Sequence, residues 1–280
     1  MIAGDGLCPR AFRHSGRAGF ALERFVIVMF NLLTPPFVAG AAVVAAAGSC
    51  AYYATYAVRS QWLGPTAWHG RRDTHSAALT FDDGPSEDTE RVLDVLDRLN
   101  LRAAFFMIGR HVERFPRVAR SVAERGHEIG NHSYSHPIYL YRSGRETRRQ
   151  VTRAQAVIED ATGVSPRLAR PPCGVRTPAY FAAVRELGLR TVQWDVAGFD
   201  WMRRSAPEIA RAVLEGARAG SIVLLHDGDS EGKRDRRETV AALPFIVEGL
   251  RERGLCVAAL SELLKDESRE AKSVVDYGAA

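Results

Sequence analysis

The chain has 280 residues, and its sequence predicts an α/β protein with a parallel sheet, open or closed into a barrel, after an N-terminal transmembrane helix. Two observations predict this. From residue 76 to about 265, short apolar runs alternate with longer stretches whose apolar residues recur at helical spacing. In addition, no charged side chain lies between Arg24 and Arg59. The composition, 46% apolar and 25% charged, allows a sizeable core.

The uncharged segment is divided by Pro35-Pro36, because proline breaks helical hydrogen bonding. Its second part, residues 37–58, would span roughly 33 Å as a helix, and a bilayer core is about 30 Å thick. A buried core helix, a cleaved signal peptide and a lipoprotein-type signal around Cys50 are the alternatives. We favour an uncleaved anchor, since the segment is apolar all round. The positive-inside rule then places the N-terminus in the cytoplasm and the rest outside the membrane, because four arginines precede the segment: Arg10, Arg13, Arg17 and Arg24.

The remaining chain divides into elements by its pattern. Helices are expected where one face is apolar, at 89–99 and at 206–219, the second starting at Ala206-Pro207. Strands are expected at 77–81, 102–108, 127–131, near Leu168, and at 190–194, 221–225 and 255–260. Glycines that suit helix C-caps precede three of these strands: Gly126, Gly188 and Gly254. The predicted organisation is a cytoplasmic segment (1–24), a membrane anchor (25–58, helix 37–58), a linker (59–75), one folded domain (76–265) and a flexible tail (266–280).

Charge and cysteine usage exclude several classes of protein. The formal charge is +5, but the basic residues are spread along the chain without interleaved aromatics, which argues against nucleic-acid binding. The cysteines form no CxxC pair, so neither a zinc ribbon nor a disulfide framework is expected. Cys256 lies in an apolar run and is expected to be a buried thiol.

Polar residues follow the predicted strands, at the ends that converge in a parallel α/β fold. His132 and His136 are spaced i, i+4, so both imidazoles can face one ion. Two histidines and one carboxylate form a common catalytic zinc set, and either Asp82 or Asp83 can supply the carboxylate. The other aspartate can then act as a base, with Arg170 as its charge partner.

Five motifs stand in order along the chain: TFDDGP at 80–85, NHSYSH at 131–136, RPPCG at 170–174, DW at 200–201 and LLHDG at 224–228. With them, residues 76–265 resemble the polysaccharide deacetylases, that is, the NodB-homology domain or carbohydrate esterase family 4. The resemblance implies a distorted (β/α) barrel of about seven parallel strands around one divalent metal ion. Zinc is the expected ion, with cobalt, nickel or manganese as alternatives.

The same resemblance implies roles for single residues. Asp83, His132 and His136 would bind the metal. Asp82 would be the general base, held by Arg170, and His226 the general acid, oriented by Asp200. The substrate-binding residues would be Trp201, Leu224, Cys173 and Pro172. The chain departs from the family pattern at Cys173, where an aromatic residue is common, and at Ala197, where an aspartate is usual; Asp195 is expected to be solvated or paired with an arginine.

The sequence therefore predicts a membrane-anchored, metal-dependent hydrolase of the cell envelope. It would remove N-acetyl groups from N-acetylglucosamine residues of an extracytoplasmic glycan, either peptidoglycan or a chitin-like oligosaccharide. One alternative is a deacylase or deformylase of a membrane lipid-linked sugar. The other is an inert glycan-binding relative, which the complete set of site residues disfavours. Residues 228–234, after His226, either contact substrate or form a surface loop. The sequence does not specify the sugar, its linkage or the oligomeric state.

Overall fold

The computed structural model of the chain describes residues 35–265. Predictions about the cytoplasmic segment, the first part of the apolar segment and the C-terminal tail therefore lie outside the described residues. The chain divides into two compact units, Met1–Tyr52 and Tyr53–Ala280. The second unit contains all the strands described below, and each unit is treated by itself.

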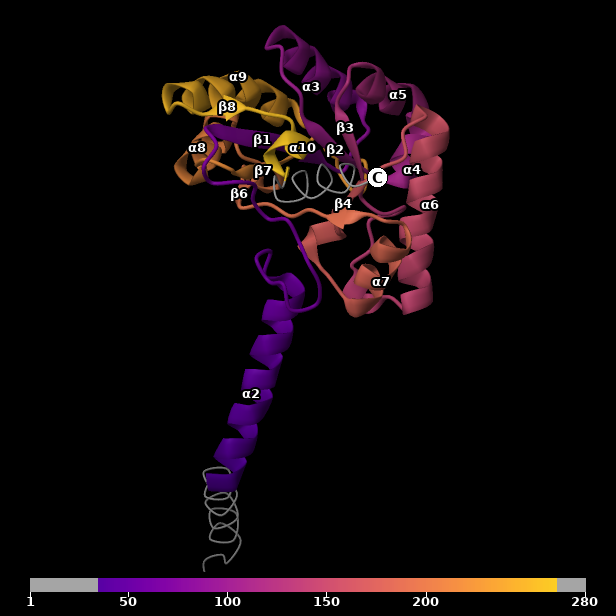
Figure 1. The fold of residues 1–280 in the computed structure, drawn as a ribbon, viewed down its shortest axis with the longest axis vertical. Coiled ribbons are helices and arrows are strands. Elements are labelled where there is room, and N and C mark those ends of the chain that lie inside the picture. The colour runs from indigo at the N-terminus through magenta and orange to yellow at the C-terminus, as the bar shows by residue number, and fades with distance from the viewer. Residues whose placement is uncertain (1–34, 266–280) are drawn as a thin grey trace, which may run out of the picture. The chain divides into compact units, whose positions relative to one another are not determined.

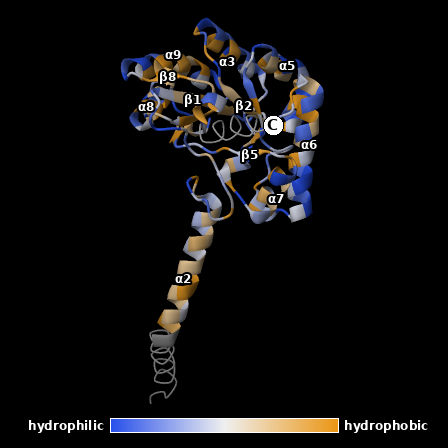
Figure 2. Cartoon of the chain, in the orientation of Figure 1, coloured by the Kyte–Doolittle hydropathy of each residue, from blue (hydrophilic) through white to orange (hydrophobic). Residues whose placement is uncertain are grey.

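Helix α2 (Pro35–Tyr56) forms the apolar part of the N-terminal region. It begins at the two prolines, because the first turn of a helix needs no N–H donors, and it ends two residues before the predicted end. Phe37–Tyr56 is long and apolar enough to cross a membrane, and Figure 2 shows hydrophobic colour along the helix. A signal sequence near an N-terminus has the same length and composition, so α2 is a candidate membrane span.

A sheet of parallel strands forms the centre of the second unit (Figure 1). Its order is β5-β4-β3-β2-β1-β7-β6, and β8 pairs with β1 off this path. The predicted α/β fold of about seven parallel strands is confirmed as a half-barrel. The strands are β1 (Ser76–Asp82), β2 (Ala104–Met107), β3 (Glu128–Asn131), β4 (Leu168–Ala169), β5 (Arg190–Thr191), β6 (Val196–Ala197), β7 (Ile222–His226) and β8 (Cys256–Val257).

Helices surround the strands and bury one side of the sheet. Alternate residues of β1 show how: Leu79 and Phe81 pack in the core shared with the helices, whereas Ala78 packs in the smaller core on the other side of the sheet. The helices of this unit are α3 (Glu87–Arg98), α4 (Gly109–Arg114), α5 (Pro116–Glu124), α6 (Gly144–Thr162), α7 (Pro178–Glu186), α8 (Ala206–Gly216), α9 (Arg237–Glu252) and α10 (Leu260–Leu263).

The predicted helix boundaries have local causes. A capping box between Ser86 and Thr89 starts α3, and another between Ser205 and Glu208 starts α8, with Pro207 in its first turn. The three predicted C-cap glycines, Gly126, Gly188 and Gly254, have φ of +76°, +65° and +72° just after α5, α7 and α9. These positive φ values favour glycine, so this prediction is confirmed.

The prediction for Cys256 is wrong, and the predicted linker before β1 packs on the folded domain. Cys256 is exposed and not a buried thiol, because β8 is a two-residue strand that pairs only with Ser76 and Ala77. Residues 57–75 lack regular helices and strands but pack on the half-barrel. Ala67 forms a bridge with Val192 beside β5, and the Gly70 N–H donates to the Gly220 carbonyl.

Candidate active site

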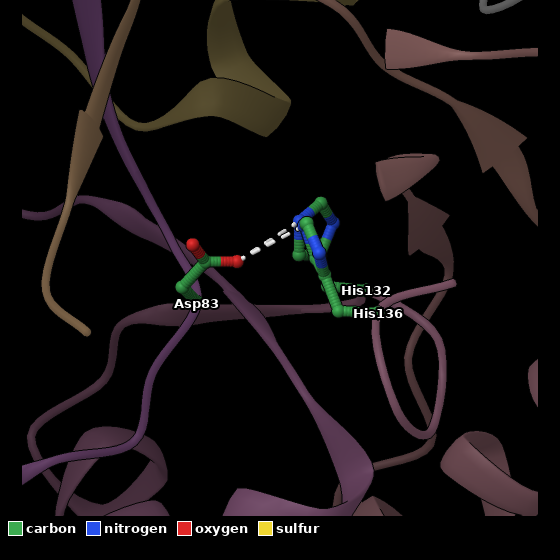
Figure 3. Close-up of side chains that lie close together, drawn as sticks. All are labelled: Asp83, His132 and His136. Carbon is green, nitrogen blue, oxygen red and sulfur yellow. Dashed lines mark ion pairs between the residues drawn. The ribbon is translucent and has the colours of Figure 1, made fainter. Parts of the chain in front are cut away.

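Three metal-ligating side chains meet at the carboxyl ends of β1 and β3 (Figure 3). Asp83 directly follows β1, His132 directly follows β3, and His136 lies four residues further on. The Asp83 Oδ1 atom is 3.5 Å from His132 Nε2 and 3.3 Å from His136 Nε2. The three ligand atoms lie within 4.8 Å of one another, so all can reach one ion.

The same three residues fit a divalent cation in their chemistry. The Asp83 Oδ1 atom is buried and has no hydrogen-bond partner among the described residues, which is costly for a carboxylate oxygen unless a cation binds it. The His132 Nδ1 atom lies 2.7 Å from the Arg170 carbonyl. A proton on Nδ1 leaves the lone pair of Nε2 directed at the site, the usual arrangement of a metal-binding histidine.

Two of the three residues are in ionisation states that suit metal binding. Burial lowers the pKa of His136 to about 4, so this imidazole is neutral at pH 7. Burial alone would raise the pKa of Asp83, but the nearby imidazoles of His132 and His136 outweigh it and hold that pKa well below its usual range. The site therefore presents a carboxylate and a neutral imidazole, which are the forms that ligate metals. At the third, His132, burial lowers the pKa, but the carboxylates of Asp82 and Asp83 outweigh burial and raise it, so a cation that binds there displaces a proton.

The carboxylate of Asp82, the last residue of β1, is directed toward Arg170. Its Oδ1 atom accepts a hydrogen bond of 2.7 Å from Arg170 Nη1, while its Oδ2 atom is 3.8 Å from His132 Nε2. The fully buried guanidinium has fixed partners on every side: Thr80 Oγ1, the carbonyls of Val192 and Gln193, and the ring of Phe106 at 4.1 Å. The two adjacent aspartates thus have different nearest partners, Arg170 for Asp82 and the two histidines for Asp83, which offsets part of the repulsion between them.

His226 ends β7 beside Asp82, its partner in the strand register. Its Nδ1 atom is 2.8 Å from Asp200 Oδ1, and its backbone N–H donates to Asp200 Oδ2 at 2.8 Å. Burial opposes a charge on this imidazole, but the charge and hydrogen bond of Asp200 outweigh it and raise the pKa of His226 to about 9. The imidazole is therefore protonated at pH 7.

The four predicted substrate-binding residues lie at or near this rim. The Trp201 ring meets the His226 ring edge-on at 5.3 Å. Cys173 reaches solvent, but the surrounding rim partly desolvates its thiol, and this desolvation together with the charges of Asp83 and Asp82 raises the pKa of the thiol, which keeps it protonated. Pro172 is buried beside it, and Leu224 is buried in β7 two residues before His226, on the same side of the strand.

Asp227 is a site residue that the sequence reasoning missed. Its carboxylate accepts hydrogen bonds from the Gly84 N–H at 3.1 Å and from Thr89 Oγ1 at 2.6 Å, and burial raises its pKa to about 7. A Cβ atom at Gly84 would lie 2.1 Å from this carboxylate, so only glycine allows the contact. Its position directly after His226 in the LLHDG motif was the feature of the sequence that could have identified it.

Asp195 is paired with an arginine, which is one of the two states that the sequence predicted for it. Its carboxylate is 2.8 Å from Arg72 and also accepts the Ile222 N–H at 2.8 Å. It therefore ties the segment before β1 to the start of β7, away from the metal-ligating group.

Backbone strain gathers in the loops of the same rim. Seven described non-glycine residues have positive φ, and six of them follow the carboxyl ends of strands: Asp83, Ser133, His136, Cys173, Phe199 and Arg203. Such conformations cost about 1–3 kcal/mol each and cluster at functional sites. The strain marks this rim as the functional end of the half-barrel.

Fold and site together define a class: a parallel half-barrel with one candidate metal site, flanked by a buried carboxylate–arginine pair and a histidine–aspartate pair. Comparison with known proteins agrees. The polysaccharide deacetylase family model matches residues 69–192. A chitooligosaccharide deacetylase of Azorhizobium caulinodans is 36% identical over 194 residues, covering 66% of this chain and 92% of the relative. The chain belongs to the polysaccharide deacetylase family.

Two further likenesses concern peptidoglycan. The peptidoglycan-N-acetylglucosamine deacetylase PgdA of Listeria monocytogenes is 36% identical over 200 residues, which cover 71% of this chain but only 41% of the relative's length. The crystal structure of the Bc1960 peptidoglycan N-acetylglucosamine deacetylase, bound to a naphthalenyl N-hydroxybenzamide, superposes with a TM-score of 0.66 at 33% identity. It covers 71% of this chain and 92% of that one.

Proposed function

We propose that this chain is a metal-dependent N-deacetylase that hydrolyses the acetamido group of N-acetylglucosamine residues in a glycan. The observation that carries the proposal is the meeting of three units at one rim: the Asp83–His132–His136 group, the Asp82–Arg170 pair and the His226–Asp200 pair. The relatives named as peptidoglycan and chitooligosaccharide deacetylases support it.

Asp83, His132 and His136 would hold a divalent ion, most simply zinc, which when bound polarises a carbonyl and lowers the pKa of water from 15.7 to about 7. Asp82 accepts the proton of the attacking water as general base. Arg170 orients the Asp82 carboxylate by binding one of its oxygens, which leaves the other free for the proton.

His226 supplies the proton that the reaction needs on the other side. An amine leaves an amide carbon readily only when its nitrogen is protonated, so a general acid is required. Asp200 binds Nδ1 and thereby directs the Nε2 proton of His226 away from itself and toward the substrate. Trp201, Leu224, Cys173 and Pro172 would enclose the acetyl group.

The function is tested by measuring acetate release from chitin oligomers, peptidoglycan, acetylated xylan and a lipid-linked N-acetylated sugar. We expect release from N-acetylglucosamine glycans, loss of release after chelation, and recovery on addition of zinc or cobalt. Full activity in metal-free protein would overturn the metal assignment. Stoichiometric metal binding without release from any substrate would instead support an inert glycan-binding protein.

We further propose that residues 25–58 anchor the protein in a membrane, with residues 76–265 as an extracytoplasmic catalytic domain. The candidate span Phe37–Tyr56 supports the anchor, and relatives named for peptidoglycan support the location. The same helix favours a lipid-linked sugar as the second candidate substrate. Alkaline extraction of membranes tests the anchor, since a cleaved signal peptide would leave the catalytic domain in the soluble fraction.

A further inference from the structure

A basic pocket of about 510 Å³ adjoins the candidate active site, and the roles above leave it unassigned. Asp200 and Trp201 form its wall toward the site. Five cationic side chains line it: Arg203, Arg204, Lys233, Arg234 and Arg236. Two of these come from the segment after His226 that the sequence left open between substrate contact and surface loop.

The carboxylates of the basic pocket are already engaged. Asp200 binds His226, Glu238 accepts the Ala206 N–H at 2.7 Å, and Asp235 lies 3.8 Å from Arg237. The five cations outnumber the three carboxylates, so the pocket keeps a net positive charge.

Most of the cations bind a carboxylate or a backbone carbonyl, but two do not, although Arg204 packs on the Phe199 ring. Arg236 is buried and donates to the Gly228 carbonyl, Lys233 pairs with Glu231, and Arg234 donates to the Trp201 carbonyl at 3.2 Å. Within the described part of the chain, neither Arg203 nor Arg204 has an ion pair. These two guanidinium groups are available to an anion.

A row of aromatic rings lies between the Arg204 guanidinium and the proposed acid, His226. The Arg204 guanidinium carbon lies 5.0 Å from the centre of the Phe199 ring, which lies 5.3 Å from Trp201, which lies 5.3 Å from His226. An anion in the basic pocket is thus separated from the proposed acid by aromatic side chains of the size that sugar rings stack on. These rings offer apolar faces to a sugar next to the one that is deacetylated.

We propose that the basic pocket binds a carboxylate of the glycan substrate, carried beside the N-acetylated sugar that is hydrolysed. Arg203 and Arg204 would form charge-assisted hydrogen bonds to it, for which the planar guanidinium is well suited. Chitin-like oligomers are neutral, whereas peptidoglycan strands carry carboxylates on their peptide stems. The pocket therefore selects the peptidoglycan class. This inference rests on the proposed deacetylase function.

The test compares wild type with an Arg203→Gln/Arg204→Gln double variant of the full chain. The matched control is Arg98→Gln. Arg98 is exposed and lies at the C-terminal end of α3, and this helix runs from the site to the other end of the half-barrel. The substrates are peptidoglycan fragments with free carboxylates, the same fragments with carboxylates amidated, and chitin tetramer.

We expect the double variant to raise KM for the carboxylated fragments roughly tenfold and to leave kcat within about twofold. KM for the amidated fragments and for chitin tetramer should not change. An Arg203→Lys/Arg204→Lys variant should restore part of the affinity, and added salt should weaken wild-type binding of the carboxylated fragments only.

Equal KM values in wild type and double variant, or equal losses on charged and neutral substrates, would overturn the proposal. So would a loss confined to a lipid-linked sugar diphosphate, which would assign the pocket to phosphate. Absence of acetate release from every substrate with the wild type would reject the deacetylase function instead. Calorimetric binding of the carboxylated fragments would then still test the pocket.

Discussion

Two histidines at opposite ends of the half-barrel, the buried His127 and the half-buried His226, differ in charge. His127 precedes β3, and burial lowers its pKa to about 4. His226 ends β7, and its pKa is raised to about 9. Burial acts in the same direction on both imidazoles, so it does not explain the difference. The carboxylate of Asp200 does: His226 is 2.8 Å from it, whereas His127 Nε2 has no hydrogen-bond partner among the described residues.

The comparison extends to the two ends of the fold. The end with His226 holds the Asp82–Arg170 and His226–Asp200 pairs and six of the seven described non-glycine residues with positive φ, whereas His127 at the other end has no such charge partner. Partnered buried charges are costly to arrange, so they are expected where chemistry uses them. The following experiments examine this difference, beginning with the largest effect.

Asp82→Asn should lower kcat by about 10³-fold or more, because an amide cannot accept the proton of the attacking water. The metal content should remain, since the metal-ligating group uses Asp83. Acetate release and elemental analysis check the two statements. Loss of metal in this variant would contradict the division of roles between the adjacent aspartates, and Arg98→Gln serves as the unaffected control.

Asp200→Asn should move the alkaline limb of the pH–rate profile to lower pH. A general acid must be protonated, so activity falls as pH rises through the pKa of His226, about 9. Without the Asp200 charge, the largest contribution that raises this pKa is lost, so the pKa falls. The profile of kcat against pH measures it. An unchanged limb would mean that another group supplies the proton.

Arg176→Met should destabilise the second unit by about 3 kcal/mol or more while sparing kcat of the folded enzyme. Arg176 is fully buried and donates to backbone carbonyls around the end of α2: those of Thr55, Ala57, Val58 and Ser60. Methionine fills similar space but leaves these acceptors unpaired. Urea unfolding measures the loss, and a midpoint equal to wild type would contradict the account.

His127→Phe should have the smallest effect, within about 1 kcal/mol at pH 7, because the ring packs edge-on against Phe105 at 5.3 Å. The variant should lose less stability in acid. The unfolded histidine binds a proton below pH 6.5 and the folded one only near pH 4, so this group costs stability as pH falls between these values. Thermal melts at pH 7 and pH 4.5 compare the two proteins, and parallel losses would refute the explanation.

Local sequence was sufficient for seven of the described strands and for helices α3 and α8, but no apolar run predicted β6. Apolar runs predicted β1 and β7, the glycines predicted the ends of three helices, and the motifs predicted which side chains gather at the rim. The exposure of Cys256 was not predictable in this way, because it depends on β8 being a short strand with few partners. Nor did the pattern around residue 67 reveal its bridge to Val192.

By itself, the sequence determined the fold class and which side chains gather at the rim, because strand periodicity, caps and motif spacing are short-range properties. The tertiary structure decided how Asp82 and Asp83 divide their partners, since Arg170 lies 88 positions from Asp82. It also decided which histidine is charged, and that Arg203 and Arg204 share a pocket with Lys233. These outcomes depend on distances between segments that are far apart in the chain, and only the closing of the half-barrel sets those distances.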